Sequence, residues 1–200
     1  MRTDFQIHDA DPREIYKLLT SVVVPRPIAW VSTLTSTGMV NLAPHSFYNV
    51  ACARPPIVQF SSVGKKDTLR NVLDTGEFVV NLATAPMLQA VNNSSARFAS
   101  DESEVRHLHI EMEPSLSVAP PRVAGSPVAI ECQVHSTHEL GDSTLILGDV
   151  TTISIKDDVM VDGHPEFALL EPLARLGKNE WGVRPQVLSV PRPVRPEDIG

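Results

Sequence analysis

The chain has 200 residues, of which 42% are hydrophobic, so it is long and apolar enough to bury the core of one domain. Its formal net charge of −7 argues against a nucleic-acid or anionic-membrane partner, because no large basic surplus is present. Cys52 and Cys132 make neither a CxxC pair nor a disulfide framework, and the N-terminus lacks the apolar core of a signal peptide, so we predict a cytoplasmic protein.

A short helix over residues 9–20 is the first predicted element. Asp11 can cap its N-terminus, and Pro12 suits the first turn because that position needs no N–H donor. The apolar residues have the i, i+3, i+4 spacing of one buried face: Ile15, Leu18 and Leu19.

Long strands dominate the rest of the chain, and the first of them has prolines, Pro25 and Pro27, that place its start at a sheet edge. Strands are predicted over residues 22–38, 55–63, 77–84, 126–140 and 141–155. The last two are expected to pair antiparallel around a turn at residues 136–144. Because strands dominate over helices, we predict a mainly β protein, a Greek-key β-barrel with flanking helices, rather than a doubly wound sheet.

The last residues of the chain are rich in proline, in the stretch RPQVLSVPRPVRPEDIG. We predict an extended strand there, followed by a stiff end from about residue 190 within a single domain that covers residues 1–200. This tail either packs on a partner subunit or is solvated.

The first chemical motif is SSVGKKDTLRN, residues 61–71, which runs from a strand through a loop into a helix predicted over residues 66–76. A helix N-terminus attracts anions through its free N–H groups and its dipole. Gly64 permits close backbone approach, and hydroxyls and ammonium groups surround the position: Ser61, Ser62, Lys65, Lys66 and Thr68. The motif is either a phosphate site or an ordinary helix start with Asp67 as its N-cap.

The second motif is RPIAWVSTLTSTGMVNLAPHSFYN, residues 26–49, in which Pro44 stiffens the chain and leaves neighbouring N–H and C=O groups free. Asn41, His45 and Ser46 can bind the edge of a flat heterocycle, and Trp30, Phe47 and Tyr48 can supply flat surface. A ring that carries a phosphate would use both motifs at once. Read alone, His45 is more often a structural histidine, and Phe47 and Tyr48 are more often core residues.

Four stretches in this order resemble the flavin reductase-like family with its FMN-binding split β-barrel: residues 26–50, 55–83, 141–150 and 172–181. The resemblance covers about residues 20–193 and implies an FMN-binding homodimer with the flavin at or near the subunit interface. FAD is a possible alternative flavin, and NAD(P)H is the implied co-substrate.

The resemblance also implies the residues of the site. Ring-side contacts fall on Ser32, Thr33, Asn41, Ala43, Pro44, His45 and Ser46. Phosphate and ribityl contacts fall on Ser61, Ser62, Lys66, Asp67 and Thr68, with Arg97 as an added charge. Arg175, Gly177 and Trp181 match a family segment that lies against the flavin or nicotinamide.

One departure from the family concerns the nicotinamide. Some flavin reductases have GDH where this chain has Gly141, Asp142 and Ser143, and that histidine faces the nicotinamide in those relatives. His164 can substitute for it, or it can be a turn histidine. His45, His164 and Trp181 are therefore the candidates near the nicotinamide, and no acid–base dyad is required because the flavin carries the redox chemistry.

Three functions follow from these features. The favoured one is an oxidoreductase that reduces FMN with NAD(P)H and passes electrons to a free flavin, an oxygenase partner or a small acceptor. The others are a flavoredoxin-like electron carrier and a non-catalytic flavin-binding module. A native metal site is not expected, because the paired histidines at 107 and 109 and at 135 and 138 lack a completing ligand pattern.

Overall fold

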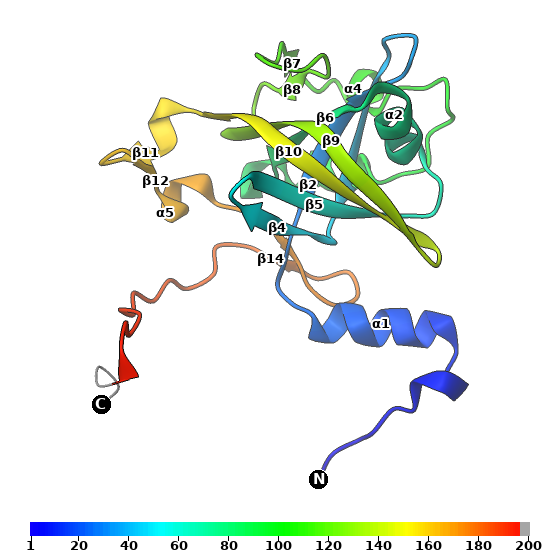
Figure 1. Cartoon of the computed structure of the whole chain (residues 1–200), viewed down its shortest axis with the longest axis vertical. Helices are drawn as coiled ribbons and strands as arrows, with labels where there is room; N and C mark the ends of the chain where they lie inside the picture. The colour runs from blue at the N-terminus through cyan, green and yellow to red at the C-terminus, as the bar shows by residue number, and fades with distance from the viewer. Residues whose placement is uncertain (197–200) are drawn as a thin grey trace.

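A seven-stranded antiparallel sheet carries much of the apolar core of the chain, of which the computed structural model describes residues 1–196. Its strand order is β3-β2-β6-β9-β10-β5-β4. The strands are β2 (Ala29–Leu34), β3 (Val40–His45), β4 (Tyr48–Ala53), β5 (Pro56–Val63), β6 (Glu77–Leu82), β9 (Val128–Leu140) and β10 (Ser143–Ile155). Figure 1 shows them wrapped around a common centre, with the tip of the β9–β10 hairpin projecting beyond it. The predicted mainly β class is confirmed.

The ends of this sheet are brought together by one very short connection. β3 and β4 lie at opposite ends of the strand order, yet only Ser46 and Phe47 separate them in the chain. A connection of this length spans only about 10 Å, so the sheet must curl until its ends approach. The Ser61 N–H donates to the Phe47 carbonyl at 2.8 Å, and no ladder joins β3 to β4 within residues 1–196. The result is a barrel that stays split between these two strands.

The long hairpin of β9 and β10 confirms the predicted antiparallel pair and corrects its turn. Leu140 pairs with Ser143, so the turn is only Gly141 and Asp142, with Gly141 at a φ of 62° that glycine adopts without strain. Further along β10, Gly148 lies under the ring of Phe78. A Cβ at Gly148 would stand 2.3 Å from Phe78 Cζ, so the core packing requires a residue with no side chain there.

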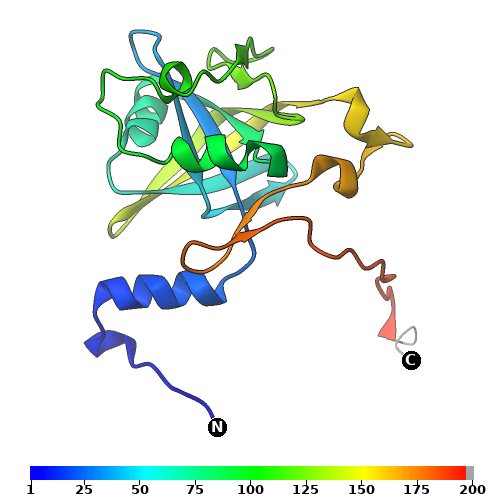
Figure 2. The same ribbon diagram turned by 180° about the vertical axis from the view of Figure 1, so that it is seen from behind.

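Helix α1 (Pro12–Val22) forms where it was predicted, with the Asp11 carboxylate accepting a hydrogen bond from the Arg13 N–H at 2.7 Å. The helix runs outside the barrel (Figure 2), and its expected buried face is only partly covered. Ile15 and Leu18 are half-buried, whereas Leu19 is 55% exposed. The apolar stripe therefore predicted the helix correctly, and its packing on this chain only in part.

Arg26 attaches the end of α1 to the barrel. This buried side chain donates to the carbonyls of Thr20 at 2.5 Å, Val23 at 2.7 Å and Leu176 at 3.0 Å. Gly177 packs on the same helix, since a Cβ there would lie 2.7 Å from Ser21 Oγ. The end of α1 and the loop around residue 177 are thus held together.

Helix α2 (Asp67–Thr75) covers the sheet and ends at Gly76, whose φ of 73° confirms the predicted C-terminal glycine. Leu69 and Val72 are buried against the core cluster, whereas Leu73, expected on the same stripe, is 59% exposed. The helix therefore uses a narrower apolar face than the sequence pattern suggested.

Short elements complete the structure. β1 (Arg26–Pro27), β13 (Ala174–Arg175) and β14 (Trp181–Gly182) make a three-stranded sheet, and β1 lies at its edge, as Pro25 and Pro27 predicted. Two small hairpins pair β7 (Met112–Glu113) with β8 (Arg122–Val123) and β11 (Met160–Val161) with β12 (His164–Pro165). The remaining helices are α3 (Leu88–Asn93), α4 (Glu104–His107), α5 (Phe167–Leu170), and the 3-10 turns η1 (Ile7–Asp9), η2 (Ala85–Met87) and η3 (Asp157–Val159). Among the described helices, none has the length and apolar character needed to cross a membrane.

The strand predicted in the proline-rich tail is not present in residues 183–196. Prolines donate no backbone hydrogen bond, and this segment finds no partner strand among residues 1–196. Val187, Leu188 and Val190 are 64%, 77% and 80% exposed. The predicted stiff end extends to residue 200, and residues 197–200 lie outside the described part.

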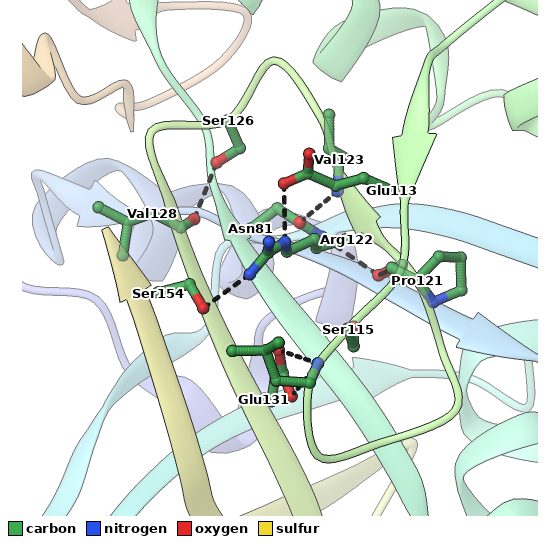
Figure 3. Close-up of polar contacts among 12 residues, drawn as sticks. Asn81, Glu113, Ser115, Pro121, Arg122, Val123, Ser126, Val128, Glu131 and Ser154 are labelled. Carbon is green, nitrogen blue, oxygen red and sulfur yellow. Dashed lines mark hydrogen bonds and ion pairs between the residues drawn. The ribbon is translucent and has the colours of Figure 1, made fainter. Parts of the chain in front are cut away.

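A buried polar network fastens the loop before β9 to the sheet, as Figure 3 shows. The carboxylate of Glu131, fully buried on β9, accepts hydrogen bonds from the Leu116 N–H at 2.9 Å and the Ser117 N–H at 2.6 Å. Burial alone would raise the pKa of Glu131, but these hydrogen bonds outweigh it and hold the pKa below its usual value. Arg122 adds an ion pair to Glu113 at 2.7 Å and a hydrogen bond to Ser154 at 2.7 Å.

Candidate functional site

A pocket of about 630 Å³ opens at the split of the barrel, within the size range of cofactor sites. Its walls come from β3 and the residues after it, the end of β5, the loop into α2, the segment after α3, and single residues of α1 and α4. The lining residues are Tyr16, Asn41, Ala43, Pro44, His45, Ser46, Phe47, Ser61, Val63, Gly64, Lys65, Lys66, Asp67, Thr68, Ser94, Ser95, Ala96, Arg97, Phe98 and Glu104. The short β3–β4 connection thus sets one wall, and the α2 N-terminus sets another.

The α2 end of the pocket has the properties of an anion site. Lys66 occupies the N-cap position, and its side chain makes no capping hydrogen bond to the first-turn N–H groups of the helix. Asp67, proposed as an alternative N-cap, is instead the first helical residue, and its carboxylate pairs with Arg70. Lys65 and Lys66 also line this end, so positive charge and free N–H donors converge on one region.

Thr68 is held ready to donate a hydrogen bond. It is buried in the first turn of α2, and its Oγ1 accepts a hydrogen bond from Asn41 Nδ2 at 3.1 Å. Because the hydroxyl is already used as an acceptor, its own proton is left for another partner. Thr68 lines the pocket, so that proton is available to an anion bound there.

His45 lies on the wall formed by β3, packed 4.8 Å from the ring of Phe60. Burial lowers the pKa of His45 to about 4, although a hydrogen bond with the Ser61 backbone opposes the shift, and the charge of Lys66 lowers it further. The imidazole is therefore neutral at pH 7. Its Nε2 is buried and has no hydrogen-bond partner among the described residues, a cost that a polar ligand with a small adjustment of the ring would remove.

Most of the predicted flavin contacts come together in this pocket. Its lining includes Asn41, Ala43, Pro44, His45, Ser46, Ser61, Lys66, Asp67, Thr68 and Arg97. These residues come from three separate stretches of sequence, so the fold brings together the two motifs that a phosphorylated heterocycle would need.

Four predicted contacts are not among the lining residues: Arg175 lines a neighbouring pocket, and three others have hydroxyl groups that bind inside the protein. Ser32 Oγ donates to the Pro121 carbonyl at 2.6 Å. Thr33 Oγ1 accepts from Asn71 Nδ2 at 3.0 Å, and Ser62 Oγ donates to the Gly64 carbonyl at 3.3 Å. All three residues are fully buried.

A smaller pocket of about 160 Å³ adjoins the first and shares Pro44, Ser46 and Ser95 with it. Arg175 and Trp181 line it and are directly paired across β13 and β14, with the guanidinium 4.7 Å from the indole centroid. His164 and Ser143 line neither pocket; His164 is exposed on the β11–β12 hairpin, and Ser143 donates to the Asp142 carboxylate at 2.8 Å.

The sequence interpretation missed several residues of the larger pocket: Tyr16, Ser94, Ser95, Ala96, Phe98 and Glu104. Glu104 is 5% exposed and accepts a hydrogen bond from the Leu42 N–H at 3.1 Å. Burial raises its pKa, hydrogen bonds from its own N–H and that of Leu42 oppose the rise, and Asp67 adds to it. The polar run around Arg97 was a usable signal, whereas nothing near Tyr16 in sequence indicated a pocket residue.

A split β-barrel with a ring-sized cleft beside a cationic helix N-terminus defines a flavin-binding class of protein. The model of the flavin reductase like domain matches residues 21–169, and the chain belongs to this family of flavin-binding oxidoreductases. The resemblance inferred from the sequence is confirmed.

Relatives and solved structures agree with this assignment. An uncharacterized protein of Halalkalibacterium halodurans is 38% identical over 193 residues, which cover 90% of this chain and 92% of that one. The reductase subunit HsaB of a flavin-dependent monooxygenase of Mycobacterium tuberculosis is 28% identical over 144 residues, 72% of each chain.

Two crystal structures superpose closely on the chain. Nitrilotriacetate monooxygenase component B from Bacillus cereus has a TM-score of 0.90 at 26% identity, covering 95% of this chain and 99% of that one. The 2-nitrobenzoate 2-nitroreductase NbaA of Pseudomonas fluorescens has a TM-score of 0.89 at 25% identity, covering 96% and 97%.

The buried, neutral His45 generates a prediction about stability and pH. Its pKa is about 4 in the folded chain and 6.5 in an unfolded one, so between these values the unfolded chain binds the extra proton. Stability should therefore fall as the pH drops from 6.5 towards 4, with up to about 3 kcal/mol due to this residue. Urea unfolding at several pH values should show that the free energy of unfolding falls less between pH 6.5 and 4 in His45→Gln than in the wild type.

His164→Gln is the matched control, because that histidine is exposed on a hairpin, and it should keep the wild-type pH dependence. If the free energy of unfolding of His45→Gln falls at acidic pH as much as that of the wild type, the assignment of a buried, neutral imidazole is contradicted.

Proposed function

We propose that the protein binds FMN and uses NAD(P)H to reduce it, passing electrons to a free flavin, an oxygenase partner or a small acceptor. The observation that carries the proposal is the single pocket in which the uncapped N-terminus of α2, with Lys65 and Lys66, faces the β3 wall that contains His45. An anion site beside a mixed polar and apolar cleft suits a phosphorylated heterocycle.

The residues present fit FMN by their chemistry. The α2 N-terminus, Lys66 and Thr68 would hold the phosphate, because they offer backbone N–H groups, a charge and a free hydroxyl proton. Residues 41–46 would face the ring, where Asn41 and the unsatisfied His45 Nε2 offer polar edges. Arg97 would add a second cation to the pocket. FAD is the alternative flavin, in which a diphosphate joined to adenosine takes the place of the terminal phosphate of FMN.

When bound, the flavin would supply the redox chemistry by accepting a hydride and releasing electrons to the acceptor. The protein's own part is placement and electrostatics. A neutral His45 adds no positive charge beside the ring site, and the buried ring of Phe60 packs against the imidazole. The smaller pocket, with Trp181 at its wall, would receive the nicotinamide ring of NAD(P)H next to the flavin.

An oxygenase partner is supported by the relatives, since one is named as a monooxygenase reductase subunit and another as a monooxygenase component. We further propose that the protein acts in the cytoplasm. The two free cysteines, Cys52 and Cys132, suit a reducing compartment.

A first prediction tests the phosphate site. Replacing Lys66 and Thr68 together by Ala should weaken FMN binding by roughly a hundredfold, because charge-assisted hydrogen bonds contribute about 1.5–3 kcal/mol each. Riboflavin, which lacks the phosphate, should lose much less. Fluorescence titration of both flavins measures the difference, with the exposed Lys156→Ala as the control variant. Equal losses for FMN and riboflavin would show that the phosphate does not bind at α2.

A second prediction tests the reductase activity. NADH or NADPH should bleach the bound FMN under anaerobic conditions, and Trp181→Ala should slow this reduction by about tenfold, or about 1.4 kcal/mol of transition-state placement. FMN affinity should change less, and Leu116→Ala should react like the wild type, because Leu116 is exposed and lines neither pocket. Stopped-flow absorbance measures the rate of flavin reduction in the two variants and the wild type. Bleaching by dithionite but by neither nucleotide would instead identify a flavoredoxin-like electron carrier.

A third prediction concerns assembly. We propose a homodimer, because α1 carries apolar side chains that the barrel leaves uncovered and the tail exposes more of them: Leu19, Val22, Val23, Val187, Leu188 and Val190. Analytical ultracentrifugation at micromolar concentration should give the mass of two chains, and Leu19→Glu with Val22→Glu should shift it towards one. A monomeric wild type that binds FMN fully would argue against a flavin site at a subunit interface.

A further inference from the structure

The smaller pocket has the size of a single six-membered ring. Its volume is about 160 Å³, close to the roughly 150 Å³ of a protein cavity that accommodates benzene. Pockets for larger ligands begin at about 300 Å³, so the three fused rings of a flavin belong in the larger pocket and not in this one.

The walls of this pocket suit a flat apolar ring. Ile28 and Val91 are buried, and Pro44 and the indole of Trp181 complete the apolar surface. Burying an aromatic ring against such side chains is favourable in proportion to the apolar area removed from water. Three uncharged polar residues also line the pocket, Ser46, Asn92 and Ser95, and Ser95 Oγ already donates to the Asn92 carbonyl at 2.6 Å.

The charged residue that lines this pocket is a cation. Arg175 lines it beside the Trp181 indole, and no aspartate or glutamate of residues 1–196 does. One guanidinium nitrogen donates to the Lys178 carbonyl at 2.9 Å, and Arg175 forms no ion pair within residues 1–196. A guanidinium has five N–H donors, so several remain for a ligand.

A second arginine adds to the positive charge near this pocket. Arg26 is paired directly with Arg175 across β1 and β13, and its buried Nε has no hydrogen-bond partner among the described residues. Burial is the main cause that lowers the pKa of Arg26, and the nearby charge of Arg175 lowers it further. Two like charges directly opposite each other on paired strands repel, so an anion bound close to them is favourable.

From these observations we propose that the smaller pocket binds a monocyclic aromatic carboxylate, with its ring against Trp181, Ile28 and Val91 and its carboxylate on Arg175. Because this pocket shares Pro44, Ser46 and Ser95 with the larger one, its ligand would lie beside the flavin. In that respect the inference rests on the proposed function and names a substrate class for it. The aromatic acid and the nicotinamide ring of NAD(P)H would then occupy the pocket in turn.

The test uses benzoate and its neutral analogue benzamide, titrated by calorimetry into the full chain with and without FMN. Benzoate should bind the wild type about tenfold or more tightly than benzamide, since a charge-assisted hydrogen bond contributes more than a neutral one. Arg175→Gln should weaken benzoate about tenfold and leave benzamide almost unchanged, and Arg175→Lys should keep part of the preference. Arg184→Gln is the control, because Arg184 pairs with Glu171 and does not line the pocket.

Retained benzamide binding by Arg175→Gln shows that this variant is folded, so a loss of benzoate alone is interpretable. Equal affinity of the wild type for the two probes, no measurable binding of either, or wild-type benzoate affinity in Arg175→Gln would each overturn the proposal. Benzoate selectivity without FMN binding would leave the aromatic-acid site standing while the flavin function fails. FMN reduction by NAD(P)H without benzoate selectivity would support the flavin function and overturn the aromatic-acid site.

Discussion

The connection between β3 and β4 is the constraint on which the rest of the molecule depends. The strands at the two ends of a seven-stranded sheet are joined by only Ser46 and Phe47, so the sheet has to curl and its ends have to meet. Because no ladder closes that seam within residues 1–196, the barrel keeps an opening along it. The larger pocket lies at this opening, and both connecting residues are part of its wall.

Electrostatics then divide the pocket into two parts. At the α2 end, an uncapped helix N-terminus and two lysines create a positive region. At the β3 wall, burial keeps His45 neutral, and Glu104 is a carboxyl group whose pKa burial raises. A phosphate is therefore favoured at one end and an uncharged ring at the other, which is the division that the proposed FMN ligand would require. The smaller pocket extends the pattern with Arg175 as a cation of its own.

Structural rigidity comes from groups that take no direct part in the pocket. Asn81 on β6 donates to the Trp30 carbonyl at 2.9 Å and accepts from the Val123 N–H at 2.7 Å, which ties the loop before β9 to the sheet. Glu131 holds the same loop by accepting hydrogen bonds from the N–H groups of Leu116 and Ser117. On the opposite side, Arg26 attaches α1 to the loop after β13. Such satisfied buried networks favour one arrangement of the backbone over its alternatives.

Local features of the chain were enough to predict the long strands, the two main helices and the cluster of hydroxyl and ammonium groups at the start of α2. Alternation in β9 and β10, the cap at Asp11, the stop at Gly76 and the Lys66–Thr68 cluster all act over a few residues, so sequence spacing reports them directly. Other properties depend on contacts between distant segments. Whether a hydroxyl faces a ligand or the protein is an example, since Ser32 is bound to Pro121 and Thr33 to Asn71, partners that no local pattern identifies. In the same way, Tyr16, Glu104 and Trp181 reach the two pockets only because the curled sheet brings their segments to one seam. How far the apolar face of α1 is covered is also decided by the tertiary structure, which leaves Leu19 and Val22 exposed.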